Sequence, residues 1–257
     1  MPVLPTMTRR RFYAPPSAFS SRLDSVTLAT DEARHLREVL RLKVGDDVYV
    51  FDGKGKEFHC RLEESRRDTA QLKVIAEIAP ARPESPLALT LAVALLKGEK
   101  FDLVVQKATE LGVVRVVPVV TKLADIRLRD EADAVKRVSR WQRIALEAAK
   151  QSGRAVVPAI AVPVSLTSLI HGTVKQPEAD YLMFSERNGQ SLKEAMPIST
   201  SEVTALVGSE GGWVDEELET AQRAGWTIIT LGGRTLRSET AAIAVAVLLQ
   251  HLAGDLV

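Results

Sequence analysis

The chain has 257 residues, of which 46% are hydrophobic and 26% charged, and its formal net charge is +1. These values are typical of a soluble globular protein with one large or two modest domains. They exclude a protein that binds nucleic acid through overall basicity. The single cysteine, Cys60, excludes an intramolecular disulfide and a zinc site of several cysteines, and the four histidines lack the spacing of a metal site.

The sequence shows no targeting pattern. No charged segment followed by an apolar run is found near the N-terminus, and the longest apolar run near the C-terminus, residues 241–249, is too short to span a bilayer. We therefore expect a cytoplasmic protein that binds neither a membrane nor a metal, and the single cysteine suits a reducing compartment.

Residues 1–78 predict a small β-barrel-like domain. Two runs of alternating apolar residues flank the turn at residues 52–55 and predict a pair of strands. These residues are Val48, Val50, Phe58, Cys60 and Leu62. Residues 69–78 alternate in the same way. A short helix is expected over residues 31–43, with an apolar face formed by Leu36, Val39 and Leu40.

Arginine is concentrated in this first part of the chain. Residues 9–11 are all arginine, and further arginines follow Arg34 by three and seven residues on the expected helix. A basic helix face is usually only solvated, but the neighbouring arginine run favours a surface that contacts RNA phosphates. The expected RNA-binding residues are Arg9, Arg10, Arg11, Arg37 and Arg41.

The rest of the chain predicts an α/β domain. Residues 79–86 contain three prolines and no periodicity, so they predict a linker to a second domain over residues 87–257. Strand patterns lie at residues 87–96, 113–121, 180–186, 201–208 and 226–232. Helical spacing is found over residues 99–112 and 137–153, and each of these segments ends in a glycine. The alternation predicts a mainly parallel sheet with helices on both faces.

Three strand ends can carry chemistry, because ligands of parallel α/β sheets gather at the carboxyl ends of the strands. They lie at residues 183–186, 207–212 and 231–239, and none has the glycine spacing of a dinucleotide-binding motif or a P-loop. One glycine loop indicates a tight turn or a ligand site about equally. Two such loops, the second with Arg234, Arg237 and Glu239, favour a site whose backbone binds a flat heterocycle such as adenine.

The sequence VGSEGGWVDEELETAQRAG, followed by LGGRTLRSETAAIAVAVLLQ, resembles the C-terminal signature of the SPOUT superfamily of S-adenosylmethionine-dependent RNA methyltransferases. Within that superfamily the chain is similar to the 16S ribosomal RNA uridine N3-methyltransferase family. Other segments agree with the family, in its order and over nearly the whole chain. They are RRFY, HLREVLRLKVGD, FDGKG, KGEKFDLVVQKATELGV and RWQRIALEAAKQSGR.

The resemblance implies a PUA-like RNA-binding barrel over residues 1–78, a linker over 79–86, and a SPOUT methyltransferase domain over 87–257 with a deep C-terminal trefoil knot. It also implies a homodimer through the knotted domain, which suits the apolar residues found on more than one side of the last helix. The implied cofactor is S-adenosyl-L-methionine, and the implied substrate is 16S ribosomal RNA of the small ribosomal subunit.

The resemblance also implies roles for single residues. The expected cofactor-binding residues are Phe184, Gly208, Gly211, Gly212, Leu231, Gly232 and Leu236. The N3 proton of uridine must leave during methyl transfer. We expect Arg237 to stabilise the negative charge on the uracil, with Glu210 and Glu239 as candidate bases. Each carboxylate has a structural alternative: Glu210 can bond to loop backbone, and Glu239 can interact with its helix N-terminus.

The chain departs from the family pattern in the loops. Ser209 and Gly233 stand where the family commonly has proline, and Val214 stands where it often has a small polar helix cap. Asp215, one residue later, is an alternative cap for that helix. Residues 121–128 lack the polar residues that are usual there. We expect looser loops but an intact site.

Two other functions stay open from the sequence alone. One is a non-catalytic RNA-binding protein that uses its α/β domain as a dimer scaffold. The other is a SPOUT methyltransferase that acts on transfer RNA or on another base. Binding of S-adenosylmethionine separates the first of these from an enzyme.

Overall fold

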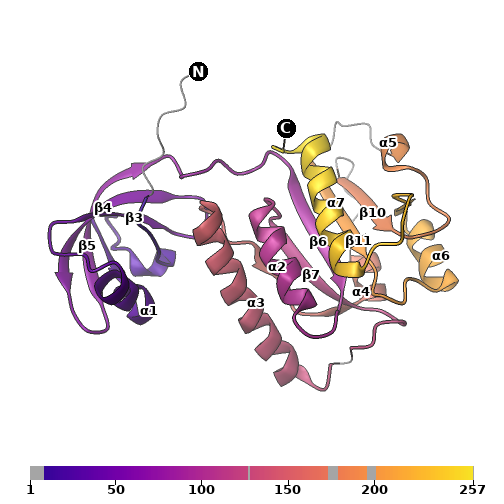
Figure 1. Cartoon of the computed structure of the whole chain (residues 1–257), viewed down its shortest axis with the longest axis horizontal. Helices are drawn as coiled ribbons and strands as arrows, with labels where there is room; N and C mark the ends of the chain where they lie inside the picture. The colour runs from indigo at the N-terminus through magenta and orange to yellow at the C-terminus, as the bar shows by residue number, and fades with distance from the viewer. Residues whose placement is uncertain (1–8, 127, 173–178, 196–200, 257) are drawn as a thin grey trace. The chain divides into compact units, whose positions relative to one another are not determined.

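The computed structural model describes residues 9–126, 128–172, 179–195 and 201–256. The chain forms two compact units (Figure 1). The first unit consists of Met1–Glu84 together with Ala149–Val157, and the second consists of Ser85–Ala148 together with Pro158–Val257. The sequence analysis predicted that residues 149–157 belong to the second domain, whereas the structure assigns them to the first unit. The contacts described below explain this difference.

The first unit is built on a five-stranded sheet in the order β1-β3-β4-β5-β2. Its strands are β1 (Arg11–Tyr13), β2 (Ser25–Leu28), β3 (Asp47–Phe51), β4 (Glu57–Ser65) and β5 (Ala70–Ile78). The predicted hairpin is confirmed, since Val48 pairs with Cys60 and Val50 with Phe58 in antiparallel register. These side chains point into one buried core, as their alternation predicts.

The helical segment of the first unit is shorter than predicted. After the 3-10 turn η1 (Pro16–Ala18), α1 (Thr30–Arg34) continues directly into the π-helical turn η2 (His35–Val39). Of the predicted apolar face only Leu36 is buried, while Val39 and Leu40 are exposed. A π-helical turn contains more residues than an α-helical turn, so it carries these two side chains away from the core.

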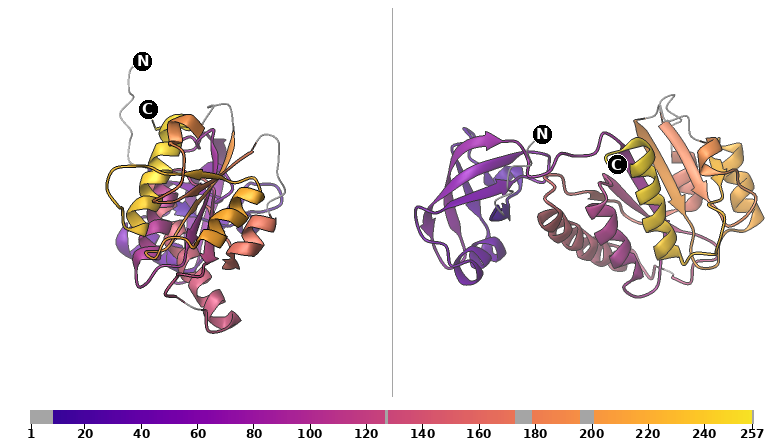
Figure 2. Two further views of the ribbon diagram at one scale, coloured as in Figure 1. Left: turned by 90° about the vertical axis from the view of Figure 1, so that its right-hand side faces the viewer. Right: turned by 45° about the horizontal axis from the view of Figure 1, so that its top comes forward.

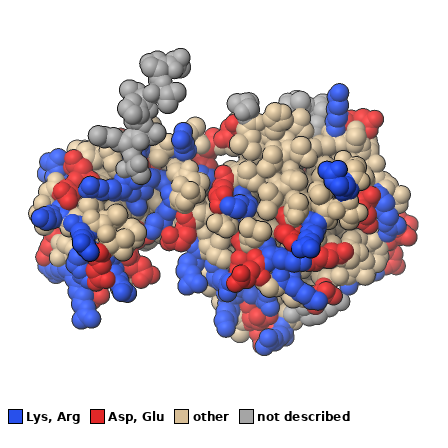
Figure 3. Space-filling view, viewed as in Figure 1, with Lys and Arg blue, Asp and Glu red and all other residues tan. Residues whose placement is uncertain are grey.

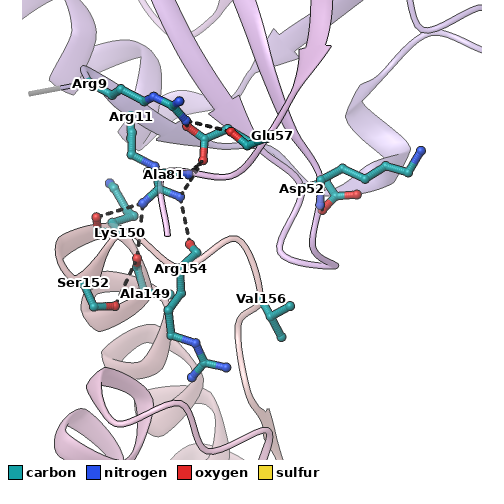
Figure 4. Close-up of polar contacts among 12 residues, drawn as sticks. Arg9, Arg11, Asp52, Glu57, Ala81, Ala149, Lys150, Ser152, Arg154 and Val156 are labelled. Carbon is teal, nitrogen blue, oxygen red and sulfur yellow. Dashed lines mark hydrogen bonds and ion pairs between the residues drawn. The ribbon is translucent and has the colours of Figure 1, made fainter. Parts of the chain in front are cut away.

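A buried ion cluster holds Ala149–Val157 in the first unit (Figure 4). The fully buried carboxylate of Glu57 accepts hydrogen bonds from Arg9 at 3.0 Å, from Arg11 at 3.2 Å and from the backbone N–H of Ala81 at 2.9 Å. The Arg11 guanidinium also donates to the carbonyl oxygens of Lys150, at 3.1 Å, and of Arg154, at 2.8 Å. A cation at this position satisfies carbonyl groups that a helix leaves unpaired at its C-terminus.

The second unit is built on a parallel sheet in the order β12-β10-β11-β6-β7-β8, and β9 also pairs with β7. Its strands are β6 (Ala88–Ala94), β7 (Arg115–Val120), β8 (Ala159–Ile160), β9 (Val164–Ser165), β10 (Ala179–Phe184), β11 (Glu202–Val207) and β12 (Thr227–Ile229). The predicted parallel α/β architecture is therefore confirmed.

Helices cover both faces of this sheet (Figure 2). They are α2 (Lys100–Glu110), α3 (Glu131–Ser152), α4 (Leu166–Gly172), α5 (Leu192–Ala195), α6 (Asp215–Arg223) and α7 (Ser238–Ala253). Helix α7 contacts α2, β6 and β11, whereas α4 and α6 contact each other and share the core around Trp213 and Trp226. Helix α3 begins six residues before the predicted start, because the side chain of Asp130 accepts the N–H of Asp133 and caps it.

The buried ion cluster gives a stability prediction. Replacing Glu57 by glutamine leaves two guanidinium groups without their buried counter-charge, so the free energy of unfolding should fall by about 3 kcal/mol. The control is Glu77→Gln, which removes an exposed ion pair with Lys56 and should cost less than about 1 kcal/mol. Urea denaturation followed by circular dichroism measures both. Equal losses for the two variants would show that the cluster does not stabilise the unit.

Candidate functional site

The parallel register brings three loops to one place in the second unit. Phe184, the last residue of β10, pairs with Val207 at the end of β11 and with Ile229 at the end of β12. The loops that follow these strands therefore leave the sheet at the same level. Together with the start of α7 they enclose a cavity of about 320 Å³, a size typical of small-ligand sites.

Most of the predicted site residues meet in this cavity. All seven expected cofactor-binding residues line it, and so does Glu210. They are Phe184, Gly208, Gly211, Gly212, Leu231, Gly232 and Leu236. The other two expected catalytic residues are not part of its lining. Arg237 is exposed at the N-cap position of α7, between the lining residues Leu236 and Ser238, while Glu239 is buried in the first turn of that helix.

Two loop glycines are required for different reasons. A Cβ atom at Gly208 would lie 3.0 Å from the Trp213 ring, whose indole N–H donates to the Phe184 carbonyl oxygen at 2.8 Å. Gly208 thus leaves room for an internal side chain. At Gly232 an added Cβ meets no atom within 4 Å, but the φ of +72° favours glycine. The constraint at Gly232 is therefore conformational.

A buried carboxylate fixes the loop between β11 and α6. Glu217 accepts the backbone N–H of Lys122 at 3.0 Å and that of Val214 at 3.2 Å. It thereby ties the segment after β7 to the glycine loop. Val214 occupies the N-cap position, and its N–H is satisfied by Glu217. Asp215, the alternative cap, is instead the first residue of the helix and pairs with Arg187 at 2.7 Å.

Lys100 lies between the two candidate bases. Its ammonium nitrogen is 2.5 Å from Oε1 of Glu210 and 3.9 Å from Oε2 of Glu239. The hydrogen bond from Lys100 lowers the pKa of Glu210, and the same bond raises the pKa of Lys100. Glu210 is therefore ionised at neutral pH. The sequence offered no signal for this contact, because its partners are 110 residues apart.

The five arginines expected to bind RNA differ in exposure and in their partners. The prediction that Arg11 binds RNA is wrong, because its side chain is only 7% exposed and bonds to Glu57 and to backbone carbonyls. Arg9 bonds to Glu57 and lies over the Tyr49 ring, at 5.2 Å from the ring centroid. Arg37 donates to the carbonyl oxygens of residues 66 and 67. Arg10 and Arg41 are exposed, and among the described residues their side chains have no hydrogen-bond or ionic partner.

Over the described ranges of the chain, no group of three histidine, cysteine, aspartate or glutamate residues could hold a metal ion. Within the same ranges no helix is both long and apolar enough to cross a membrane.

The chain matches two family models. An RNA methyltransferase domain matches residues 83–250, and an RNA methyltransferase PUA domain matches residues 28–75. A ribosomal RNA small subunit methyltransferase E from Synechocystis is 33% identical, with 84% of this chain and 70% of that protein covered. The protein of the same name from Bacillus subtilis is 28% identical over 89% of this chain and 92% of its own length.

Two solved structures are similar over nearly their whole length. A ribosomal RNA small subunit methyltransferase E from Neisseria gonorrhoeae, bound to S-adenosyl methionine, has a TM-score of 0.84 and 33% identity. The match covers 97% of this chain and 100% of that one. A Legionella pneumophila protein in complex with the same cofactor has a TM-score of 0.85 and 29% identity, and the match covers 96% of this chain and 99% of that one.

The contact between Lys100 and Glu210 gives a prediction about acid dissociation. In Lys100→Met the pKa of Glu210 should rise, because burial then acts on the carboxyl without the hydrogen bond that offsets it. A carbon NMR titration of the labelled side chain measures this shift. Lys107→Met is the control, since Lys107 lies on the same helix and pairs with Glu110 at 2.9 Å.

The same shift fixes the sign of the pH dependence of stability. A depressed pKa in the folded state means that the pair stabilises the fold above the unfolded pKa of the carboxyl, and that this contribution is lost as the pH falls through the folded value. An unchanged Glu210 midpoint in Lys100→Met would contradict the assignment.

Proposed function

Since the chain belongs to the ribosomal RNA small subunit methyltransferase E family, we propose that it methylates N3 of a uridine in 16S ribosomal RNA of the small ribosomal subunit. S-adenosyl-L-methionine is the proposed methyl donor. The observation that carries this proposal is the cavity at the ends of β10, β11 and β12, where the glycine loops meet, in a chain similar over nearly its full length to a relative bound to that cofactor.

The residues around the cavity suit this cofactor. The backbone N–H and C=O groups of Gly208, Leu231 and Gly232 can bind the edges of an adenine. Two of these three residues are glycines, so they carry no side chain that would cover the backbone. Leu236 is 40% exposed at the cavity, and its apolar surface is available to cover a bound ring. When bound, S-adenosylmethionine supplies a methyl group activated by its sulfonium, so the protein mainly has to align the reactants.

The position of each charged residue supports a different role for it. Glu210 lines the cavity and is ionised, so we assign it to accept the N3 proton. Glu239 is buried, lies outside the lining and is 3.9 Å from the Lys100 ammonium, so we assign it to position Lys100. Arg237 is exposed and has no ionic partner among the described residues, so its charge is available to stabilise the uracil anion.

Finer features of the family are part of the same proposal. They are a closed PUA-like barrel, a deep trefoil knot, a homodimer and a place in the cytoplasm. The dimer is supported by α7, where Ile243 and Leu248 stay partly exposed and Val247 is 39% exposed. An apolar helix surface of this kind favours a second subunit as its cover. A crystal structure tests the knot and the barrel, and a sedimentation mass of one chain would exclude the dimer.

Cofactor binding should depend on Gly208. In Gly208→Val the new side chain would meet the Trp213 ring and displace the loop, so the affinity for S-adenosylmethionine should fall by about tenfold or more, or 1.4 kcal/mol. Gly172→Val is the matched control, because a Cβ at Gly172 meets no atom within 4 Å. Isothermal titration calorimetry measures both variants. Equal affinities in the two variants would exclude the proposed adenine site.

The reaction itself is tested by nucleoside mass spectrometry. Small ribosomal subunits from a strain that lacks this protein should gain one methyl group at N3 of a uridine after incubation with the enzyme and cofactor. Arg237→Met should lower kcat by about a hundredfold, because it removes one electrostatic stabiliser, while cofactor affinity stays within about twofold.

The competing functions give other results. Binding of RNA without methyl transfer would favour the non-catalytic alternative. Methylation of transfer RNA in a parallel incubation, with 16S ribosomal RNA unmodified, would favour a different substrate.

A further inference from the structure

The middle of α3 is a purely cationic stretch. Residues 134–146 contain four basic side chains and no acidic one. They are Lys136, Arg137, Arg140 and Arg143. Three of them are exposed, and only Arg137 is half-buried. Figure 3 shows lysine and arginine side chains gathered over the lower part of this helix and the neighbouring α2, with acidic side chains among them.

This stretch forms one wall of a groove, which we call the α2–α3 groove. The groove has a volume of about 650 Å³, and its other wall consists of Gly98 and Glu99, just before α2, with Phe101 and Asp102 in the first turn of α2. Part of its lining is apolar, because the buried rings of Phe101 and Trp141 pack there with their centroids 4.4 Å apart. The groove is therefore a built concave surface, with cations along one side.

The acidic residues Glu99, Asp102 and Asp133 also line the groove and neutralise only part of this charge. Asp102 accepts hydrogen bonds from Arg140 and from the indole N–H of Trp141, and Asp133 pairs with Arg137 at 3.2 Å. Lys136 and Arg143 have no ionic partner among the described residues. They are seven residues apart, which is about 10.5 Å along a helix. One small anion cannot contact both, whereas an extended polyanion can.

The groove adjoins the candidate active site. The first turn of α2 contributes Glu99, Phe101 and Asp102 to the groove, while Lys100 in the same turn reaches Glu210 in the wall of the cavity. One helical turn thus separates the two concave surfaces. A nucleotide chain that follows the groove can present one of its bases to the cavity.

We propose that the α2–α3 groove holds the phosphate backbone of the substrate RNA, next to the nucleotide that is methylated, through Lys136 and Arg143. This inference rests on the proposed function for the nature of the polyanion. Ion pairs with phosphate bind without regard to sequence, so the groove positions the strand, and the cavity selects the base.

The test uses the full chain with Lys136 and Arg143 both replaced by alanine. Its affinity for 16S ribosomal RNA, measured by filter binding at several potassium chloride concentrations, should fall on the order of tenfold. The slope of log affinity against log salt should shrink by roughly 0.7 to 0.9 for each lost contact. S-adenosylmethionine affinity should be unchanged. The control is Lys193→Ala with Arg223→Ala, two exposed cations of the same unit outside the groove.

The outcomes separate this inference from the proposed function. Unchanged RNA affinity and salt slope in the groove variant would overturn it, even if the wild-type protein methylates 16S ribosomal RNA. A groove-dependent slope would support it, even if no methyl transfer is found. Normal binding to the naked RNA, with lost methylation of assembled subunits, would also overturn it, because the groove would then bind an acidic protein.

Discussion

The carboxyl ends of β10, β11 and β12 lie side by side, and the rest of the site depends on this register. Phe184 pairs with both Val207 and Ile229, so segments that are more than 20 residues apart in sequence begin their loops at one level. No single loop encloses a ligand. The cavity forms because β10 lies between β12 and β11. The loops after these three parallel strands all leave the same edge of the sheet, where ligands of such sheets bind.

Long side chains support the loop between β11 and α6, and one of them, Trp213, belongs to the loop itself. Trp213 fills the space that Gly208 leaves, Glu217 joins the segment after β7 to the first loop, and Lys100 reaches Glu210 from α2. Each contact fixes a loop that glycine makes flexible. This arrangement offsets the departure at Ser209, in the same loop, where a proline would otherwise stiffen the chain.

The sequence predicts the regular elements better than the contacts between them. Gly112 and Gly153 end helices as expected, with φ of +79° and +86°, because helix C-terminal signals are local. The loop residues of the cavity follow from the glycine pattern and the family resemblance. The contact of Lys100 with Glu210 and the burial of Arg11 could not be predicted, because the partners are distant in sequence. Every residue also carries a backbone carbonyl, so residue type does not indicate which carbonyl accepts a hydrogen bond.

The membership of Ala149–Val157 in the first unit has a consequence for how the protein can be made and divided. Arg11 finds its carbonyl acceptors only when residues up to Arg154 are present, so the first unit cannot complete its polar contacts while its own first 84 residues emerge from a ribosome. We infer that it finishes folding after much of the second unit has been synthesised. Expression of residues 9–84 alone would leave Arg11 without these acceptors. Cutting the chain in the proline-rich segment, residues 79–86, would therefore not yield two independent domains.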